Sequence, residues 1–258
     1  MGESRHNPNQ LLKTIQADEG NRNKGHLKIF FGYAAGVGKT YAMLEAAHME
    51  KQQGIDVVAG YVEPHARPKT AALLNGLEVL PTSEVLYNGM ILNEFDIDMA
   101  LKRKPQLILV DELAHTNAEG CRHAKRYQDI KELLNAGIDV YTTVNVQHIE
   151  SLCDTVASIT EIVVRERIPD SLFDNADQIE LIDIEPQDLI DRLNTENVYR
   201  QTQAKQAVEN FFTIENLTAL REIALRRCAD RVNILTENAR IKNHGDYHTD
   251  EHILVCLS

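Results

Sequence analysis

Short apolar runs alternate with longer helix-like segments along most of the chain. The apolar runs predict strands over residues 27–31, 56–62, 107–110, 139–146, 161–165 and 179–184. The segments between them predict helices over residues 40–53, 70–77, 92–103, 130–135 and 148–156. Strands that alternate with helices form a parallel sheet that is covered on both faces. The pattern therefore predicts a three-layer α/β fold with a mostly parallel sheet.

The pattern changes after Pro186, where helices follow one another without strands between them. Their predicted ranges are 187–193, 203–212 and 215–232. The last helix carries an apolar stripe, formed by Leu217, Leu220, Ala224 and Cys228, which indicates one buried face. Beyond it, the polar residues 236–250 predict a linker, and residues 252–257 predict one more strand.

These changes of pattern predict the domain organisation. Residues 1–24 are polar and read as a leader. Residues 25–233 form the main domain, with its core at 25–185 and a helical extension at 186–233. Residues 234–258 are then a linker and the first strand of a further, truncated domain.

Composition limits the classes of function. Of the 258 residues, 43% are hydrophobic, which is enough for a large packed core. The net charge of −12 argues against nucleic acid as the main partner, since surfaces that bind nucleic acid are basic. No apolar run approaches the roughly 18 residues of a membrane span, and the polar start lacks a signal peptide. The four scattered cysteines predict neither a disulfide framework nor a zinc site, and we expect a cytoplasmic protein.

A glycine-rich turn between the first strand and the first helix points to phosphate binding. Its second half reads Gly36-Val37-Gly38-Lys39-Thr40. In such a loop the backbone N–H groups cradle phosphates, the lysine reaches the β- and γ-phosphates, and the threonine hydroxyl binds Mg²⁺. The predicted nucleotide-binding residues are Gly32, Gly36, Val37, Gly38, Lys39, Thr40 and Tyr41. The alternative is a strand-to-helix turn that binds no ligand.

The first half of this turn departs from the usual spacing. A glycine is expected five residues before Gly38, but Tyr33 stands there and the nearest glycine is Gly32. Tyr33 would either close part of the loop mouth or stack on a base.

Two carboxylates follow the apolar strand at 107–110. Asp111 fits the strand-end aspartate that holds the Mg²⁺ of a phosphate-loop protein, together with Thr40. Glu112 would then activate a water molecule if hydrolysis occurs. The alternative is that Asp111 caps the following turn and Glu112 is a solvated residue at the rim.

Other polar residues lie where they could contact phosphate. Arg122 and Arg126 belong to a polar loop that resembles a switch, although basic loops are often only solvated. Asn145, Gln147 and His148 lie at the end of the strand at 139–146 and could sense the γ-phosphate or position water, because strand ends face the ligand crevice in open α/β sheets. Local capping by these three residues is the alternative. Four residues beyond the second strand share the same expected crevice: Glu63, His65, Arg67 and Thr70.

Together, these residues resemble the N-terminal domain of the KdpD family, the potassium-sensing and osmosensing histidine kinases of bacterial two-component systems. The similarity extends from about residue 25 to 233. The blocks that carry it are 31–41 around Lys39, Gly60-Tyr-Val-Glu, Leu107-Ile-Leu-Val-Asp-Glu-Leu-Ala-His-Thr-Asn, Arg122-His-Ala-Lys-Arg-Tyr-Gln-Asp, Asp139-Val-Tyr-Thr-Thr-Val-Asn-Val-Gln-His-Ile-Glu-Ser-Leu and Val164-Arg-Glu-Arg-Ile-Pro-Asp-Ser.

The resemblance implies a phosphate-loop NTPase-like domain that binds ATP and Mg²⁺ and regulates the kinase. Lys39 and Thr40 match the family's Walker A residues, and Asp111 matches its Walker B aspartate. Two departures are Ala34-Ala35, where family members often have Ala-Pro, and Cys121, where they have serine.

The resemblance also implies the domains that would surround this one. A universal-stress-protein-like domain, membrane helices and the kinase core would follow, which places this domain on the cytoplasmic face of a membrane protein. The phospho-acceptor histidine and the kinase nucleotide boxes are absent from the sequence, so we expect no autophosphorylation. A response regulator would be reached only through the kinase core.

Three functions remain open from the sequence. The first is an ATP-sensing regulatory domain of a sensor kinase, the second a self-standing slow ATPase, and the third an interaction scaffold with a vestigial nucleotide site. The sequence leaves open the stimulus, the oligomeric state, a homodimer included, and the choice between ATP and GTP.

Overall fold

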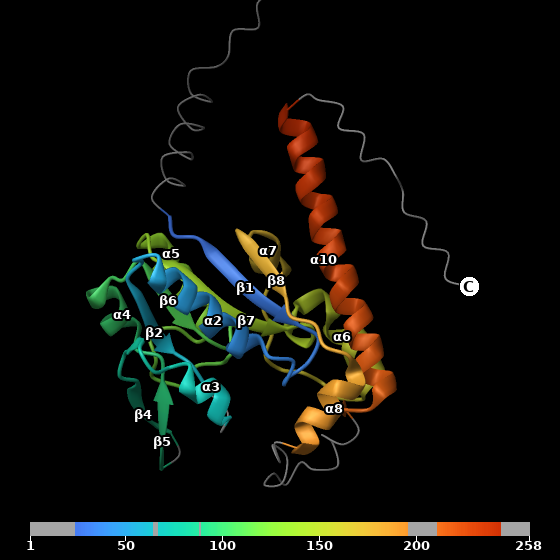
Figure 1. Ribbon diagram of the computed structural model, residues 1–258, viewed down its shortest axis with the longest axis horizontal. Coiled ribbons are helices and arrows are strands. Elements are labelled where there is room, and N and C mark those ends of the chain that lie inside the picture. Colours follow the sequence, from blue (N-terminus) through green and yellow to red (C-terminus); the bar gives the residue numbers. More distant parts are fainter. Residues whose placement is uncertain (1–23, 64–66, 88, 196–210, 244–258) are drawn as a thin grey trace, which may run out of the picture.

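The computed structural model describes residues 24–63, 67–87, 89–195 and 211–243, and its arrangement is shown in Figure 1. Six strands form one sheet in the order β3-β2-β6-β7-β1-β8, and every pairing in it is parallel. The strands are β1 (Leu27–Gly32), β2 (Val57–Tyr61), β3 (Glu78–Val79), β6 (Leu107–Val110), β7 (Asp139–Asn145) and β8 (Gln178–Leu181). A separate antiparallel hairpin pairs β4 (Ser83–Tyr87) with β5 (Met90–Glu94).

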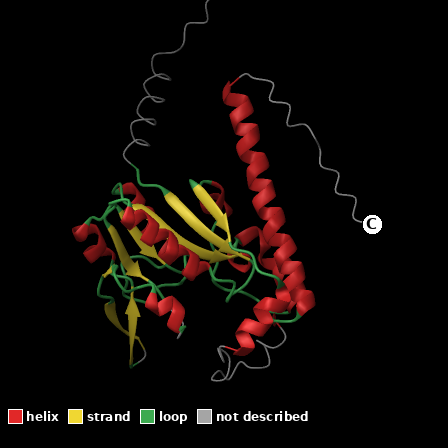
Figure 2. Ribbon diagram, viewed as in Figure 1, coloured by secondary structure: helices red, strands yellow, loops and turns green. Residues whose placement is uncertain are grey.

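Helices cover the sheet, as Figure 2 shows. They are α2 (Lys39–Gln52), α3 (Pro68–Ala72), α4 (Ile97–Arg103), α5 (Arg126–Asn135), α6 (Cys153–Thr160), α7 (Asp170–Asp174), α8 (Pro186–Thr195) and α10 (Ile214–Asn243). Two short 3₁₀ turns, η1 (Val146–His148) and η2 (Glu150–Leu152), connect β7 to α6. Among the described helices, none is long and apolar enough to cross a membrane.

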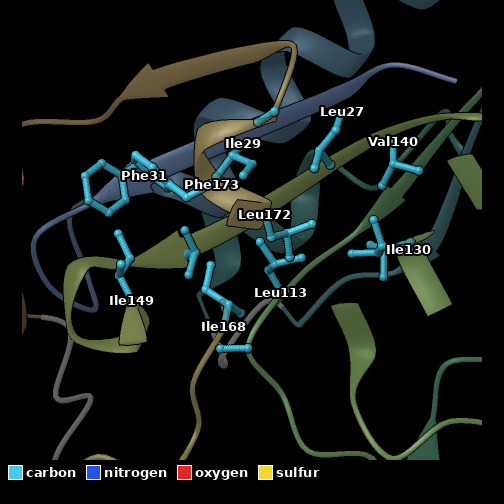
Figure 3. Packing of buried hydrophobic residues seen from close by; sticks show 14 of the residues in the cluster. Leu27, Ile29, Phe31, Leu113, Ile130, Val140, Ile149, Ile168, Leu172 and Phe173 are labelled. Atoms are coloured by element: carbon cyan, nitrogen blue, oxygen red, sulfur yellow. The ribbon is translucent and has the colours of Figure 1, made fainter. Parts of the chain in front are cut away.

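Both faces of the sheet are buried, because successive side chains of its strands enter two different apolar clusters. On β1, Phe30 packs with Met43 and Leu44 of α2. Its neighbours Ile29 and Phe31 enter the larger cluster on the opposite face, which includes Phe173 of α7 (Figure 3). This is the burial expected of a central parallel strand. The structure therefore confirms the predicted three-layer α/β fold with a parallel sheet.

Several predicted elements differ from the structure. Residues 161–165 form no strand, because Glu161 ends α6 in a left-handed conformation and β8 occupies the sheet edge beside β1. The predicted helix over 92–103 is wrong in its first part, which belongs to β5. Asp96 accepts a hydrogen bond from the Met99 N–H at 2.8 Å and so caps α4 at its true start. The helix predicted over 148–156 begins only at Cys153.

The C-terminal helix is longer than predicted. α10 continues to Asn243, so the linker expected at 236–250 is wrong for residues 236–243. Several predictions concern residues outside the described ranges: residues 1–23 of the leader at 1–24, His65, most of the helix at 203–212, residues 244–250 of the linker and the strand at 252–257. α3 is also shorter than the helix predicted over 70–77, since it ends at Ala72.

Candidate functional site

The predicted phosphate loop lines a pocket of about 320 Å³ at the carboxyl ends of β1, β2, β6 and β7. Residues 35, 36 and 38–41, from the loop and the start of α2, form one wall. The remaining lining residues are Glu63, Arg67, Thr70, Asp111, Glu112, Thr143 and Asn145. These residues come from four separate parts of the sequence, and they meet because parallel strands all end at the same edge of the sheet.

The loop has the backbone that its glycines predict. Gly36 and Gly38 have φ angles of 94° and 111°, a region that favours glycine, and α2 begins directly after Gly38. Lys39 is buried, and its Nζ donates a hydrogen bond to the Ala34 carbonyl oxygen at 3.0 Å. Burial lowers the pKa of Lys39 from 10.5 to about 8. An anionic group beside this amine would favour its charged form.

Two predicted residues support the loop from beneath and do not line the pocket. A Cβ added at Gly32 would lie 2.6 Å from Cγ2 of Val37, so the close packing of these two residues requires glycine. Val37 is itself buried. Both therefore shape the loop.

Tyr33 does not take either role expected from its sequence position. Its ring is buried, and its hydroxyl donates a hydrogen bond to the Ile184 carbonyl oxygen at 2.9 Å. Burial raises the pKa of Tyr33 to about 12. Tyr33 therefore anchors the start of the loop to the segment before α8, and it neither covers the loop mouth nor offers a face to a base.

Thr40 and Asp111 lie together as predicted. The Thr40 hydroxyl donates to Oδ2 of Asp111 at 3.0 Å, and the Thr143 hydroxyl donates to Oδ1 of the same carboxylate. The Glu112 N–H also donates to Oδ1, at 3.0 Å, so Asp111 caps the turn that follows β6 as well as facing Thr40. The two alternatives considered for Asp111 are thus compatible.

Glu112 lies at the pocket in a strained conformation. Its φ of 59° is in the left-handed region, which is uncommon for residues other than glycine. Oε2 of its carboxylate is 3.8 Å from Nη1 of Arg126, and 36% of its side chain is exposed. The carboxylate therefore faces both the pocket and a buried cation.

The structure does not bring the two predicted loop arginines into the pocket. Arg122 pairs with Asp98 and Glu132 on the surface. Arg126 is completely buried, with Nη2 at 2.9 Å from Glu94 Oε2 and its guanidinium 4.0 Å above the Tyr61 ring. The polar sequence around these arginines predicted that they would contact solvent or phosphate. Instead, the buried Arg126 pairs with the carboxylate of Glu94, in the β4–β5 hairpin.

Of Asn145, the last residue of β7, and the two polar residues that follow it, Gln147 and His148, only Asn145 lines the pocket. Its Oδ1 is buried, and no hydrogen-bond donor among the described residues reaches it. His148 is turned toward the Glu166 carbonyl oxygen, 2.9 Å from Nδ1, and burial lowers the pKa of its imidazole. Gln147 and His148 are therefore not lining residues.

Sequence reasoning missed two residues that contact the site. Thr143 binds Asp111, and its place near the end of β7 could have identified it. Arg192 of α8 donates to the Gly36 carbonyl oxygen at 3.3 Å. No local sequence pattern identifies Arg192, because it lies 156 residues after Gly36 in the chain.

The arrangement fits an anionic phosphate group and a hard cation. The loop offers a helix N-terminus and a buried amine to the anion. Thr40 and Asp111 offer the hydroxyl and carboxylate oxygens that Mg²⁺ prefers, 3.0 Å apart at one wall of the pocket.

The chain resembles three curated proteins over most of its length. It is 59% identical over 256 residues to the sensor protein KdpD of Clostridium acetobutylicum, covering 98% of this chain and 28% of that protein. It is 53% identical over 258 residues to the sensor protein KdpD of Escherichia coli strain K12, with the same 98% and 28% coverage. The sensor protein KdpD of Mycobacterium tuberculosis strain CDC 1551 / Oshkosh is 51% identical over 208 residues, covering 81% of this chain and 24% of that protein. The chain thus spans between 24% and 28% of the length of these relatives.

Among solved structures, a DNA replication initiation factor aligns over 92% of this chain and 66% of that chain, with 12% sequence identity and a TM-score of 0.34. That likeness is too weak to support an argument. The family comparison is specific, because residues 23–232 match the family described as "KdpD: Osmosensitive K+ channel His kinase sensor domain". The chain therefore belongs to the KdpD sensor-domain family.

Proposed function

We propose that this domain binds ATP with Mg²⁺ in the pocket at the carboxyl edge of the sheet, and that nucleotide binding regulates the longer sensor kinase of which it is a part. The contact between Thr40 and Asp111 carries the proposal. It joins the start of α2 to the end of β6, and it lies in the same pocket as the buried amine of Lys39. A buried lysine at a helix N-terminus is the group that a phosphate loop offers to its anion.

Each residue has a defined part in this proposal. Lys39 and the backbone N–H groups of the loop bind the phosphates, and Thr40 and Asp111 hold the cation. Bound Mg²⁺ would neutralise phosphate charge. Asn145 offers its buried Oδ1 to a hydrogen-bond donor, and this is the group that water or a nucleotide hydroxyl would satisfy.

A thermal-shift experiment tests the proposal. Only the folded domain binds nucleotide, so Mg·ATP raises the melting temperature. At 100 times the dissociation constant, binding adds about 2.7 kcal/mol to the free energy of unfolding. ATP with EDTA is the control for the cation, and Mg·GTP tests the choice of base. An unchanged melting curve at millimolar Mg·ATP would favour the scaffold function instead.

The regulatory part of the proposal is supported by the comparisons with relatives. The matched family is described as a sensor domain of a His kinase, and the matched relatives are named sensor proteins. Because the chain spans about 28% of the first two relatives, signalling to a kinase core would require segments beyond it.

Slow ATP hydrolysis is a second candidate function, and Glu112 is the observation that favours it. Its carboxylate lies at the pocket wall next to Asp111, where it could accept a proton from an attacking water. Arg126 lies 3.8 Å from that carboxylate and competes for it, which predicts slow turnover.

Glu112→Gln is expected to retain Mg·ATP binding and to lower the hydrolysis rate by about 100-fold, because an amide cannot act as the base. Phosphate release under single-turnover conditions measures the rate, and a binding titration measures affinity. Glu84→Gln, which changes an exposed carboxylate of the hairpin, is the matched control. Undiminished hydrolysis in Glu112→Gln would exclude Glu112 as the base.

A further inference from the structure

Arg192 of α8 contacts the rear of the phosphate loop. Its Nη1 donates to the carbonyl oxygens of Gly36 and Val37, at 3.3 and 3.4 Å. The same nitrogen would lie 3.6 Å from a Cβ added at Gly38. Arg192 is not among the residues that line the pocket, so it contacts the loop from outside it.

These two hydrogen bonds determine which way the loop's peptide groups point. In a planar trans peptide, the C=O of one residue and the N–H of the next point in opposite directions. The described residues contain no cis peptide bond. Because Arg192 binds the carbonyls of Gly36 and Val37, the N–H groups of Val37 and Gly38 point away from α8. These are groups that a phosphate loop presents to its anion.

Apolar packing fixes α8 in this place. A Cβ added at Gly36 would lie 3.0 Å from both Leu189 Cδ1 and Leu193 Cδ2, so α8 packs directly on the loop backbone. Leu189 and Leu193 are buried in the main apolar cluster. Arg192 therefore projects from a well-packed helix.

α8 is also connected to α10. Arg221 of α10 binds Asp183 at 2.6 Å and Glu185 at 2.6 Å, in the segment that leads into α8. Tyr33 holds Ile184 in the same segment from the loop side. Tyr33, at the start of the loop, and Arg221 of α10 thus both bind the short segment at 183–185 that leads into α8.

We propose that Arg192 is a positioning residue that orients the Val37 and Gly38 peptide groups toward the phosphates and couples nucleotide binding to the α8–α10 helices. The role of Arg192 in orienting the loop is argued from the structure alone. Its effect on nucleotide affinity rests on the proposed ATP site.

Arg192→Ala tests the proposal with two measurements. In the nucleotide-free protein, the backbone order parameters of the Val37 and Gly38 amides fall from roughly 0.85 to below about 0.6. The dissociation constant of Mg·ATP rises about tenfold, as expected for losing hydrogen bonds from a charged donor. Arg192→Lys keeps the positive charge and one donor nitrogen, so it is expected to restore part of the loop order and part of the Mg·ATP affinity. Arg226→Ala is the matched control, because Arg226 is exposed on α10 and pairs with Glu222 of the same helix.

The outcomes separate this inference from the proposed function. If the wild type does not bind Mg·ATP but the order parameters fall only in Arg192→Ala, the positioning role is supported and the nucleotide site fails. If order parameters and affinity both match the wild type, the positioning role is overturned. A lower melting temperature with unchanged loop order, not restored by lysine, would likewise overturn it and leave Arg192 a packing residue.

Discussion

Arg126→Met is expected to lower the free energy of unfolding by about 3–5 kcal/mol, the usual effect of removing one partner of a buried ion pair. The guanidinium is completely buried, and Glu94, its partner at 2.9 Å, has a side chain only 6% exposed. Burial raises the pKa of Glu94, but the hydrogen bond from His115 and the nearby positive charges outweigh it, so the pKa lies below its usual value. The carboxylate would therefore remain charged in a site that has lost its buried arginine. Urea unfolding followed by circular dichroism measures the loss.

Arg122→Met is the matched control for this prediction. Arg122 lies four residues earlier, and its pairs with Asp98 and Glu132 are at the surface, with 45% of the arginine side chain exposed. Such pairs contribute about 0–1 kcal/mol. The double variant Arg126→Met/Glu94→Gln is expected to recover part of the lost stability, because the unpaired charge is gone. Equal effects of Arg122→Met and Arg126→Met would contradict the buried pair as the cause.

Lys39→Ala is expected to abolish the thermal shift by Mg·ATP, with affinity reduced by at least about 100-fold. Among the described residues that line the pocket, Lys39 is the one cationic side chain that is buried. The nucleotide-free variant is expected to keep its melting temperature, since it no longer buries a charge. Lys51→Ala is the matched control, because Lys51 lies at the exposed far end of the same helix. A full thermal shift in Lys39→Ala would remove Lys39 from the site.

The pKa of Lys39 provides a second test of its role in binding Mg·ATP. The folded domain releases this proton near pH 8, whereas the unfolded chain holds it up to about 10.5. Between these values the unfolded state binds more protons, so this residue's contribution to stability increases as pH rises. Phosphate requires the protonated amine, so the affinity for Mg·ATP falls as pH rises through about 8. Calorimetric titrations between pH 7 and 9.5 would measure this decrease, which Lys39→Ala should lack.

Local patterns predicted the fold well, because both faces of a parallel sheet must be apolar. The strand at 107–110 was recognised from its unbroken apolar residues, and the loop from Gly36 to Thr40 from chemistry that is local in sequence. The hairpin was missed, since its second strand, Met90–Glu94, joins helix-like residues without a glycine or proline between them.

Side chains whose environment depends on distant segments could not be predicted. Nothing near Arg126 in the sequence reveals that Glu94 meets it in the interior. Tyr33 occupies an expected glycine position, but its buried contact with Ile184 lies 151 residues away. For the same reason Arg192 could not be found, because its partners are backbone carbonyls, which leave no mark on the sequence.

The order of the strands determines the width of the candidate site. β7 lies between β1, which carries the loop, and β6, which carries Asp111. The two strand ends are therefore separated by two interstrand spacings, about 9.5 Å, and only side chains close the distance between them. This spacing comes from backbone hydrogen bonds, so it does not depend on which side chains β7 carries. β7 acts as a spacer of constant width, and the pocket can keep its dimensions while the residues around it change.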